Sequence, residues 1–377
     1  MCENYYPHLG GVEVVFKNLA EGYVKKGHYI SLLTQQLKGT KKNESIGGVS
    51  VKRVFSFFTR YLFTFLAIPQ AIRLARKNDL IQTTTFNGAF PAWLAGRITG
   101  KPVVLTVHEV WVGKWAQVTT FSPLKSAFHD FLERIIYYLP FDKYVCVSQA
   151  TKIDLLKRGV NEEKVEVIHN GLDYQFWDPK QVGEQKIQEL RSKLGLENKF
   201  VYFSWGRPGE SKGFEYAIKA IPAISKELPN SLFLLMLGSV DKYQKKYQQL
   251  MSLIMNLNLK NKVKVIQSVP YSELRDYIKA VDCIVIPSLA EGFGYTTVES
   301  VAMEKPVVVS NAGSLPEVVS GRYQIFQNKN ESDLAEKVVK MANGEYKQKE
   351  FKKFEWKESI EKYLDVYTKL LTMNQKS

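Results

Sequence analysis

The chain has 377 residues, of which 45% are hydrophobic and 24% charged, and this composition excludes collagen, a coiled coil and a wholly disordered chain. Three widely separated cysteines exclude a disulfide framework and a CxxC metal site, and they indicate reduced, buried thiols in a cytosolic protein. The net charge of +14 indicates attraction to a polyanion, with a basic surface that has no dedicated partner as the alternative.

Apolar, strand-like segments alternate with segments of helical periodicity through the first half of the chain. Only Met1–Glu3 precede the loop that leads into the first helix, so a first strand of about five or six residues has almost no room. We expect either a trimmed strand or a natural start further upstream. Short apolar runs between helices are typical of parallel strands buried on both faces. The predicted strands are Tyr29–Thr34, Leu80–Thr84, Val103–Val107 and Tyr144–Ser148, and the predicted helices include Val12–Lys26 and Leu124–Tyr138.

The basic excess is concentrated near the start, where residues 17–79 contain 12 Lys and Arg against 3 Asp and Glu. The same region holds Val54–Ile72, an apolar segment that Arg60 and Pro69 make a poor transmembrane helix. We favour a core helix there. The alternative is an interfacial helix whose apolar side chains face lipid, namely Phe57, Phe58, Tyr61, Leu62 and Phe65. The charged start and apolar run of a cleavable signal are not found.

The alternation repeats in the second half, which predicts two doubly wound α/β domains rather than one oversized sheet. The seam is expected at Asn170–Gly171, a turn signal, so that residues 1–170 and 171–354 form the two domains. Ligands of such sheets bind beyond the carboxyl ends of the strands, which places the expected active site in a cleft between the domains. The predicted strands are Phe200–Ser204, Leu232–Leu237, Val263–Ile266, Cys283–Pro287 and Val307–Ser310, and the predicted helices are Gly213–Lys226, Tyr243–Leu257, Tyr271–Ala280, Gly294–Met303 and Ser332–Ala342.

The sharpest motif is Glu291–Glu299 (EGFGYTTVE), which follows a predicted strand and opens a predicted helix. Its glycines let the backbone approach a ligand closely, and the helix N-terminus favours a phosphate. Glu291 lies before the helix and Glu299 inside it, so the two carboxylates can bind different parts of one ligand, and a carboxylate facing a sugar accepts hydroxyl hydrogen bonds. The alternative is a solvent-facing helix start, which also favours glutamate.

A second loop, Ser204–Gly213 (SWGRPGESKG), also lies between a predicted strand and a predicted helix. It carries Arg207 and Lys212, and a diphosphate favours such cations because charge-assisted hydrogen bonds are strong. The spacing is not that of a P-loop. A pair of surface cations at a turn is the alternative.

Together with Asn170–Asp173, Ala312–Glu317 and Gly10–Glu13, these two loops resemble the family 4 retaining glycosyltransferases of GT-B fold, over essentially the whole chain. The resemblance implies two Rossmann-like, doubly wound domains facing across a central cleft. It implies that residues 1–170 form the acceptor side, that residues 171–354 bind the nucleotide-sugar, and that a last helix at about 355–377 packs back on the first domain.

The resemblance also implies roles for single residues. Arg207 and Lys212 would bind the donor diphosphate and stabilise the departing nucleotide, Glu291 would bind the transferred sugar and Glu299 the ribose. The implied catalytic residues are Arg207, Lys212, Glu291 and His108, and the implied donor-binding residues are Gly11, Gly206, Phe293, Gly294 and Glu299.

His108 stands at the end of the predicted strand Val103–Val107, and the resemblance implies that it contacts the donor sugar. The chain reads His108-Glu109 where relatives often have His-Asp. Orientation and hydrogen bonding are the expected tasks of this side chain, and a core histidine is the alternative. The sequence contains no D-x-D and no Cys/His cluster, so we expect no metal and no resident cofactor, with the diphosphate neutralised by Arg207, Lys212 and helix ends.

The expected function is retaining transfer of a sugar from a nucleotide-sugar to an acceptor hydroxyl. A glycan or lipid-linked acceptor in cell-surface polysaccharide or glycolipid synthesis is expected, with a soluble sugar as the rival. The basic first fifth predicts an anionic membrane surface as a partner and a cytoplasmic location, peripheral at the inner membrane face. No nucleic-acid motif is found. The alternatives are a GT-B nucleotide-sugar epimerase or phosphorylase, or a non-catalytic nucleotide-sugar binder.

Overall fold

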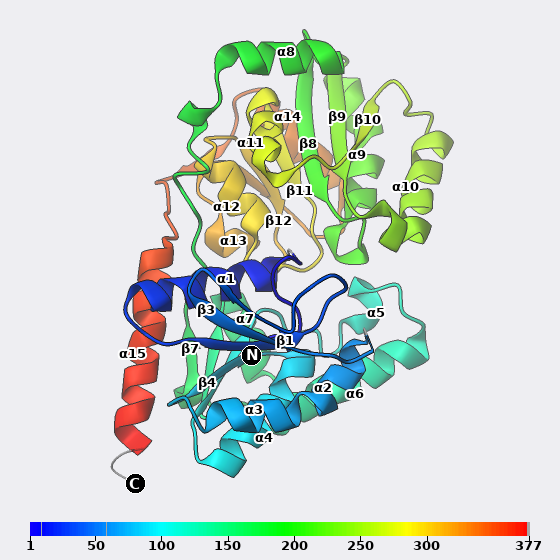
Figure 1. The fold of residues 1–377 in the computed structure, drawn as a ribbon. Helices are drawn as coiled ribbons and strands as arrows, with labels where there is room; N and C mark the ends of the chain where they lie inside the picture. Colours follow the sequence, from blue (N-terminus) through cyan, green and yellow to red (C-terminus); the bar gives the residue numbers. More distant parts are fainter. Residues whose placement is uncertain (9, 58, 375–377) are drawn as a thin grey trace. The chain divides into compact units, whose positions relative to one another are not determined.

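The computed structural model describes residues 1–8, 10–57 and 59–374, and these form two compact units (Figure 1). The first unit contains residues 1–113, 127–171 and the C-terminal segment from Phe354. The second unit contains residues 114–126 and 172–353. Each unit has its own parallel sheet, and the units are described separately below.

The larger sheet of the first unit has four parallel strands in the order β4-β5-β6-β7. The inner strand β5 is buried along its whole length, as its mostly apolar sequence predicts for a strand covered on both faces. Three of the four strands were predicted with their bounds, and β7 is the strand that was expected to end near Ile168 at the seam. The strands are β4 Ile81–Thr84, β5 Val103–Val107, β6 Lys143–Cys146 and β7 Val165–Val167, and the helices between them are α4 Ala89–Thr99, α6 Pro123–Tyr138 and α7 Gln149–Leu156.

A smaller sheet in the same unit has the order β1-β3-β2. Strand β1 (Ser31–Gln35) is parallel to β3 (Val49–Val54), whereas β2 (Asn43–Ile46) is antiparallel to β3. Gly47 and Gly48, both with positive φ, form the two-residue turn of the β2–β3 hairpin, which is the turn that such strands favour. This hairpin was not predicted from the sequence.

Four further helices complete the first unit. The C-terminal helix α15 (Trp356–Asn374) packs on α1 (Gly11–Lys25), where the hydroxyls of Tyr23 and Tyr367 lie 3.0 Å apart. The segment expected as one helix forms two, α2 (Arg60–Leu66) and α3 (Ile68–Ala75). Pro69 lies in the first turn of α3, the part of a helix where its missing N–H costs least.

The expectation that this segment lies in the core is wrong for most of its large side chains. Phe63 is fully buried, but Phe57, Tyr61, Leu62 and Phe65 are exposed. Phe58 lies outside the described residues. No helix of the described ranges is both long enough and apolar enough to cross a bilayer.

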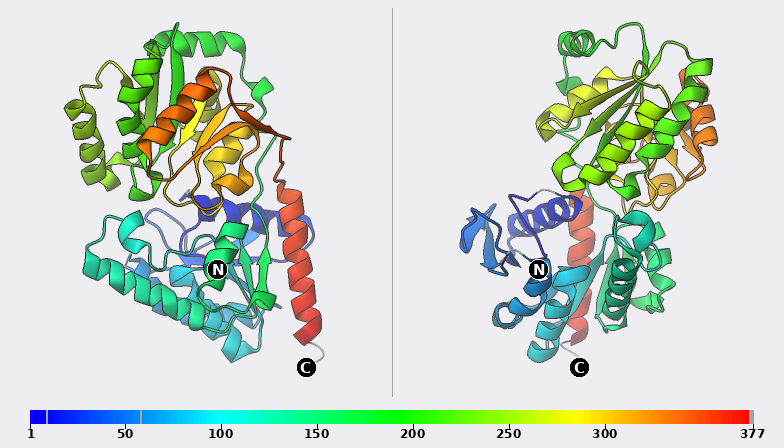
Figure 2. Two further views of the ribbon diagram at one scale, coloured as in Figure 1. Left: turned by 180° about the vertical axis from the view of Figure 1, so that it is seen from behind. Right: turned by 90° about the vertical axis from the view of Figure 1, so that its right-hand side faces the viewer.

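The second unit is built on a seven-stranded sheet with the order β10-β9-β8-β11-β12-β13-β14, parallel except for β14. Helices α9, α10 and α14 cover one face, and α8 and α11 lie on the other (Figure 2). The strands are β8 Phe200–Gly206, β9 Ser231–Leu237, β10 Val263–Gln267, β11 Cys283–Ile286, β12 Val307–Ser310, β13 Gly321–Phe326 and β14 Lys347–Lys349. The helices are α5 Trp115–Val118, α8 Glu184–Leu194, α9 Phe214–Glu227, α10 Gln244–Asn256, α11 Tyr271–Ala280, α12 Tyr295–Ala302, α13 Leu315–Val318 and α14 Glu331–Ala342.

The strand order reverses direction at β8. The chain moves from β8 through β9 to β10 on one side, then returns to β11 on the other side of β8. The loops after β8 and β11 therefore leave neighbouring strand ends in opposite directions. Ligands of open α/β sheets bind at such a point, where the strand order reverses, which is called the switch point. These loops are the two that carry the sequence motifs.

Candidate functional site

The loop after β8 presents one of the two predicted cations to the loop after β11. Between β8 and α9 lies a short 3-10 turn, Glu210–Lys212, followed by Gly213 with φ of +63°. From this turn the ammonium of Lys212 donates to the Glu291 carboxylate, with 2.5 Å between Nζ and Oε1. Both side chains are largely buried, so the ion pair is partly shielded from solvent.

Glu291 is held from several directions. The Ser288 hydroxyl donates to the same Oε1 atom at 2.9 Å, and the backbone N–H of Ser314 donates to the Glu291 carbonyl oxygen at 3.1 Å. At Gly313, where φ is +52°, a Cβ would overlap that carbonyl. The segment after β12 can therefore approach the Glu291 backbone only because residue 313 is glycine.

The two motif loops are also joined directly through the backbone. The Leu289 N–H donates to the Ser211 carbonyl oxygen at 2.7 Å, and a Cβ at Gly213 would overlap the carbonyl oxygen of Pro287. Because the contact is between two backbones, it holds the two loops at a fixed separation, from which the Lys212 and Glu291 side chains can meet.

Glu299, on the first turns of α12, is buried with 6% of its surface exposed. It accepts a hydrogen bond from the Tyr271 hydroxyl at 2.9 Å. Burial raises the pKa of Glu299 to about 7, with the Glu291 charge acting in the same direction and Tyr271 and Lys212 opposing it. The interactions with Lys212 and Glu291 indicate that all three charged groups share one environment.

The raised pKa of Glu299 predicts a pH-dependent loss of stability that Glu299→Gln removes. The folded protein holds this proton more tightly than the unfolded chain, so the stabilising contribution is complete below about pH 4.5 and is lost as the pH rises to about 7. The full shift corresponds to at most about 3 kcal/mol. Denaturant unfolding at pH 4.5 and pH 8 should show that Glu299→Gln exceeds the wild type in stability only at the higher pH. An equal difference at both pH values would contradict the shift.

The remaining predicted donor-binding residues lie on the same loops. Gly206, with φ of +145°, ends β8, and Gly294, with φ of +84°, precedes α12. Phe293 is buried, and its ring lies 5.1 Å from that of Tyr295 between centroids. Arg207 belongs to the first of these loops, but its side chain is exposed. The structure thus brings Lys212, Glu291 and Glu299 together and leaves the guanidinium of Arg207 towards solvent.

Two of the predicted site residues, His108 and Gly11, belong to the first unit, one at a strand end and one at a helix start. His108 comes directly after β5, and its ring centroid lies 6.3 Å from that of Phe16. Its Nε2 atom is buried and has no hydrogen-bond partner among the described residues. Burial lowers the pKa of His108 to about 4, so the imidazole is neutral at pH 7. Gly11 begins α1, and a Cβ added there would meet open space.

Sequence reasoning missed three polar partners of the site. Ser288 and Ser314 support Glu291, and Tyr271 binds Glu299. The sequence signal was weak for the serines, which follow predicted strand ends, and absent for Tyr271, which begins a different helix. In the described part of the chain, no three His, Cys, Asp or Glu side chains lie together so that they could hold a metal ion.

Two family models match successive parts of the chain. "Glycosyltransferase Family 4" matches residues 9–176 and "Glycosyl transferases group 1" matches residues 186–357, so that together they span most of it. A glycosyltransferase of Methanocaldococcus jannaschii, MJ1607, is 29% identical over 326 residues, covering 84% of this chain and 80% of its own. The alpha-monoglucosyldiacylglycerol synthase of Streptococcus pneumoniae is 24% identical, covering 88% of this chain and 75% of its own.

Solved structures share the two-domain architecture. The crystal structure of Anabaena Alr3699/HepE in complex with UDP and glucose superposes with a TM-score of 0.74 at 19% identity, covering 98% of both chains. At this identity the likeness concerns the fold, and it confirms the predicted GT-B class. The order of the matched family models, the two Rossmann-like units and the paired motif loops lead to one conclusion: this chain belongs to the family 4 glycosyltransferases of GT-B fold.

Proposed function

We propose that the protein is a retaining, metal-independent glycosyltransferase that moves a sugar from a nucleoside diphosphate sugar to an acceptor hydroxyl. The observation that carries the proposal is the Lys212–Glu291 ion pair at the switch point between β8 and β11. When such a donor binds, each partner of the ion pair can take a new partner. The ammonium can bind the phosphates and the carboxylate can bind the sugar hydroxyls.

The donor is proposed to lie across the two motif loops of the second unit. Lys212 and Arg207 bind the diphosphate, and the positive end of the α12 helix dipole favours the same negative charge. Glu291 and the backbone of Phe293 and Gly294 bind the transferred sugar. Glu299 accepts hydrogen bonds from the ribose, and Gly206 allows the loop to pass close to the donor. HepE, which is similar in fold, was crystallised with UDP and with UDP-glucose.

In the proposed reaction the bond between the anomeric carbon and the diphosphate oxygen breaks as the acceptor oxygen bonds to the same carbon on the same face. The acceptor proton passes to the departing phosphate oxygen, so the configuration is retained without a protein nucleophile. Lys212 and Arg207 stabilise the negative charge of the leaving group, which is the kind of preorganised stabilisation that contributes most to catalysis. Two cations and helix ends supply this charge, so no metal or resident cofactor takes part.

Gly11 and His108 are proposed to act from the first unit. Gly11 leaves open space in front of α1 for the diphosphate and the acceptor. His108 is proposed to hydrogen-bond the donor sugar through its unpartnered Nε2. A pKa of about 4 makes it a weak base at pH 7, which favours an orienting role over proton abstraction.

A lipid-linked acceptor is proposed because α6 exposes a stripe of large apolar side chains, although another of its faces packs in the core. Its buried face carries Glu133, which accepts hydrogen bonds from the Tyr137 hydroxyl and the Trp111 N–H. Its exposed face carries large apolar side chains at helical spacing, with Tyr138 80% exposed. These exposed side chains are Phe128, Phe131, Leu132, Ile135 and Tyr138. Such a surface is typical of a face that contacts a membrane or a partner.

The exposed apolar face of α6 continues onto α2. The Tyr61 hydroxyl lies 2.9 Å from Nε2 of His129, which joins the two helices, and Phe65 on α2 is 62% exposed. Exposed cations follow at Arg73 on α3 and at Arg76 and Lys77 just after this helix. Aromatic side chains beside cations suit an anionic bilayer, and this supports the proposal of a peripheral protein at the cytoplasmic membrane face. The similar enzyme of Streptococcus pneumoniae is named for a diacylglycerol product.

Vesicle binding tests the membrane surface. The protein should co-sediment with phosphatidylglycerol vesicles at low salt and less so at high salt, because the basic contribution is screened. Replacing Phe128 and Phe131 with serine should weaken binding at least about tenfold, since both rings lose their burial in lipid. Met255→Ser, at a side chain 53% exposed on α10, is the matched control. Absence of binding at low salt, or equal binding by all three proteins, would contradict the surface.

Product analysis tests the reaction and separates its rivals. With UDP-glucose as donor and a diacylglycerol as acceptor, UDP release should depend on the acceptor, persist in EDTA and give a product with the anomeric configuration of the donor. An epimerase would convert the donor without an acceptor, and a phosphorylase would require inorganic phosphate. A non-catalytic binder would release no UDP under any of these conditions, and an inverted product would exclude the retaining mechanism.

A further inference from the structure

Lys246 is a buried lysine on α10 that binds two carboxylates of neighbouring segments. Its side chain is 8% exposed, and its ammonium donates to Glu210 and to Glu215, with 3.2 Å between Nζ and Oε1 of Glu215. Glu210 begins the 3-10 turn Glu210–Lys212, and Glu215 lies in the first turn of α9. One cation therefore joins α10 to both sides of the turn that presents Lys212.

The position of Lys246 on α10 is unfavourable for a cation by itself. Lys246 is the third residue of this helix, whose first turn contains no acidic side chain. The positive end of the helix dipole lies there and favours anions over ammonium groups. The two glutamates, which lie on other segments, supply the stabilisation that the helix of Lys246 does not.

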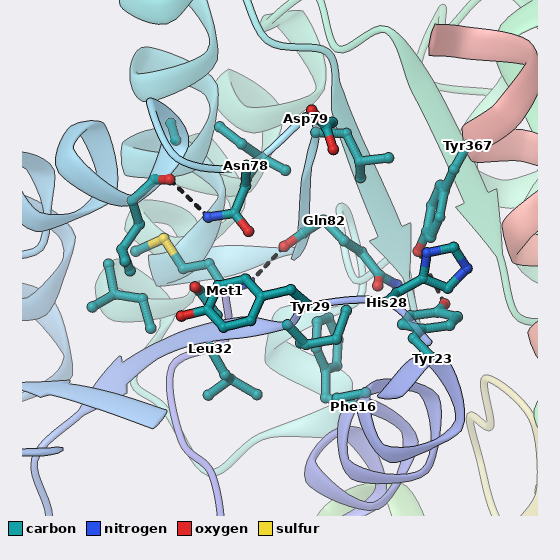
Figure 3. Close-up of a pocket in the computed structure, with 18 of the residues that line it drawn as sticks. Met1, Phe16, Tyr23, His28, Tyr29, Leu32, Asn78, Asp79, Gln82 and Tyr367 are labelled. Carbon is teal, nitrogen blue, oxygen red and sulfur yellow. Dashed lines mark hydrogen bonds between the residues drawn. The ribbon is translucent and has the colours of Figure 1, made fainter. Parts of the chain in front are cut away.

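Two buried amino groups of this chain show how much their partners matter. The Met1 amine lies at an open cavity between β1 and β4, where it donates to the Gln82 carbonyl oxygen at 2.5 Å, and burial lowers its pKa (Figure 3). Burial also disfavours the charge of Lys246, but the hydrogen bonds and charges of Glu210 and Glu215 outweigh it and raise the pKa of Lys246. Lys246 is therefore a cation at neutral pH.

The cluster of Lys246, Glu210 and Glu215 has one more carboxylate than cations. Oε2 of Glu215 is buried and has no hydrogen-bond partner among the described residues. The surplus negative charge lies beside the turn between Arg207 and Lys212, the two cations that are proposed to bind the donor phosphates. A carboxylate that reached these cations would compete with phosphate for them, since both anions bind through charge-assisted hydrogen bonds.

Glu210 is the carboxylate that can reach both cations. It follows Arg207 by three residues and precedes Lys212 by two. At 3.8 Å per residue, its Cα atom lies at most about 11 Å from that of Arg207, a distance that two long side chains can bridge. Arg207 is exposed and forms no ion pair with a carboxylate of the part of the chain that the structure describes. Lys246 holds the Glu210 carboxylate against α10 instead.

We propose that Lys246 is a positioning residue for the donor diphosphate. By holding Glu210, it keeps this carboxylate from pairing with Arg207 and Lys212, so that both cations remain available to the phosphates. Lys246 itself does not touch the donor. This role rests on the proposed phosphate site, and it adds to that site a residue from outside the two motif loops.

Two double variants of equal net charge test this role. Lys246→Met/Glu210→Gln and Lys246→Met/Glu215→Gln each lose the ammonium and one carboxylate, but only the second leaves Glu210 ionised and without its cation. The probe in titration calorimetry is the nucleoside diphosphate that the wild type binds most tightly among UDP, GDP and ADP. The variant that keeps Glu210 should bind this probe at least about tenfold more weakly than the variant that keeps Glu215, because the phosphates must displace its carboxylate.

Melting temperatures show whether the two double variants lose stability equally. The side chains of Glu210 and Glu215 are 22% and 21% exposed, so the loss of Lys246 should cost either remaining carboxylate a similar amount. Lys246→Met/Glu210→Gln should bind the probe with nearly wild-type affinity. Lys245→Met, at the exposed neighbouring lysine on α10, is the matched control and should also bind as the wild type does.

The affinities also separate this inference from the proposed function. Equal affinities of the two double variants would overturn the positioning role, since Lys246 would then act only through the stability of the fold. Failure of the wild type to bind any of the three nucleoside diphosphates would instead overturn the proposed phosphate site, and the role of Lys246 with it.

Discussion

Replacing Lys212 or Arg207 with alanine is expected to lower kcat about 10²–10³-fold, the loss found when one oxyanion donor is removed from an active site. Both residues are proposed to act on the charge that develops on the leaving diphosphate. Their effect should therefore appear in kcat more than in KM, because a group that acts mainly on the transition state affects the chemical step.

The two variants differ in what they do to the unliganded protein. Lys212 is paired with Glu291, so Lys212→Ala leaves a largely buried carboxylate without its cation and should also lower stability. Arg207 is exposed, so Arg207→Ala should leave the melting temperature close to that of the wild type. Activity loss in Arg207→Ala is therefore free of a folding contribution.

The release of nucleoside diphosphate at saturating donor concentration measures the kcat of both variants. Lys226→Ala, at an exposed lysine on the same helix α9 that Lys212 precedes, is the matched control and should keep wild-type kcat. Unchanged turnover in both Lys212→Ala and Arg207→Ala would remove these residues from the proposed phosphate site.

Gly213→Ala is expected to destabilise the second unit by about 3 kcal/mol or more. Gly213 has φ of +63°, a conformation that costs a residue with a Cβ about 1–2 kcal/mol. The added methyl group would also overlap the carbonyl oxygen of Pro287, and backbone on both sides leaves no side chain that could move away. Relief of this overlap would separate the two motif loops and pull Lys212 from Glu291.

Gly195→Ala is the matched control for this substitution. Gly195 has φ of +64°, and a Cβ there would meet open space, so only the conformational cost remains. Urea unfolding of the two variants should thus differ by the contribution of the Pro287 contact. Equal losses would mean that the close approach of the loops is not required for stability.

The buried parts of the fold were predictable because their sequences leave few choices. Apolar runs such as Val103–Val107 can be satisfied only as strands covered on both faces, and the structure has β5 at those residues. The hairpin at Gly47–Gly48 had a turn signal, but β2 is mostly polar, and in β3 the buried Arg53 stands where the alternation would place an apolar residue. The split between α2 and α3 lies next to Pro69, which was interpreted only as a break in a membrane helix.

Periodicity predicted α6 but not its orientation. A stripe of apolar residues at helical spacing is the same whether it faces a core or solvent, and only tertiary contacts decide which. In this helix the polar Glu133 is buried through two hydrogen bonds, and the apolar stripe is left outside. Val54–Ile72 was favoured as a core helix with an interfacial helix as the alternative, and the exposed face of α6 was not anticipated.

The charged core of the candidate site was predictable in part. Two glutamates after one predicted strand and two cations after another indicated one shared ligand. The structure brings Lys212, Glu291 and Glu299 together. Ser288, Ser314 and Tyr271 could not be found in this way, because each acts through a contact between segments that are far apart in sequence. The backbone contact of Gly213 with Pro287 likewise depends on tertiary packing.

Thermal stability in the presence of nucleotide-sugars tests the central claim most directly. A ligand that binds only the native protein raises its melting temperature, so at least one nucleoside diphosphate sugar should do so in EDTA, and its effect should disappear when Arg207 and Lys212 are both alanine. The opposite result would be no shift with any nucleotide-sugar, or a shift that the double variant retains in full. Either outcome would show that the cations between β8 and α9 do not hold the phosphates of an activated sugar.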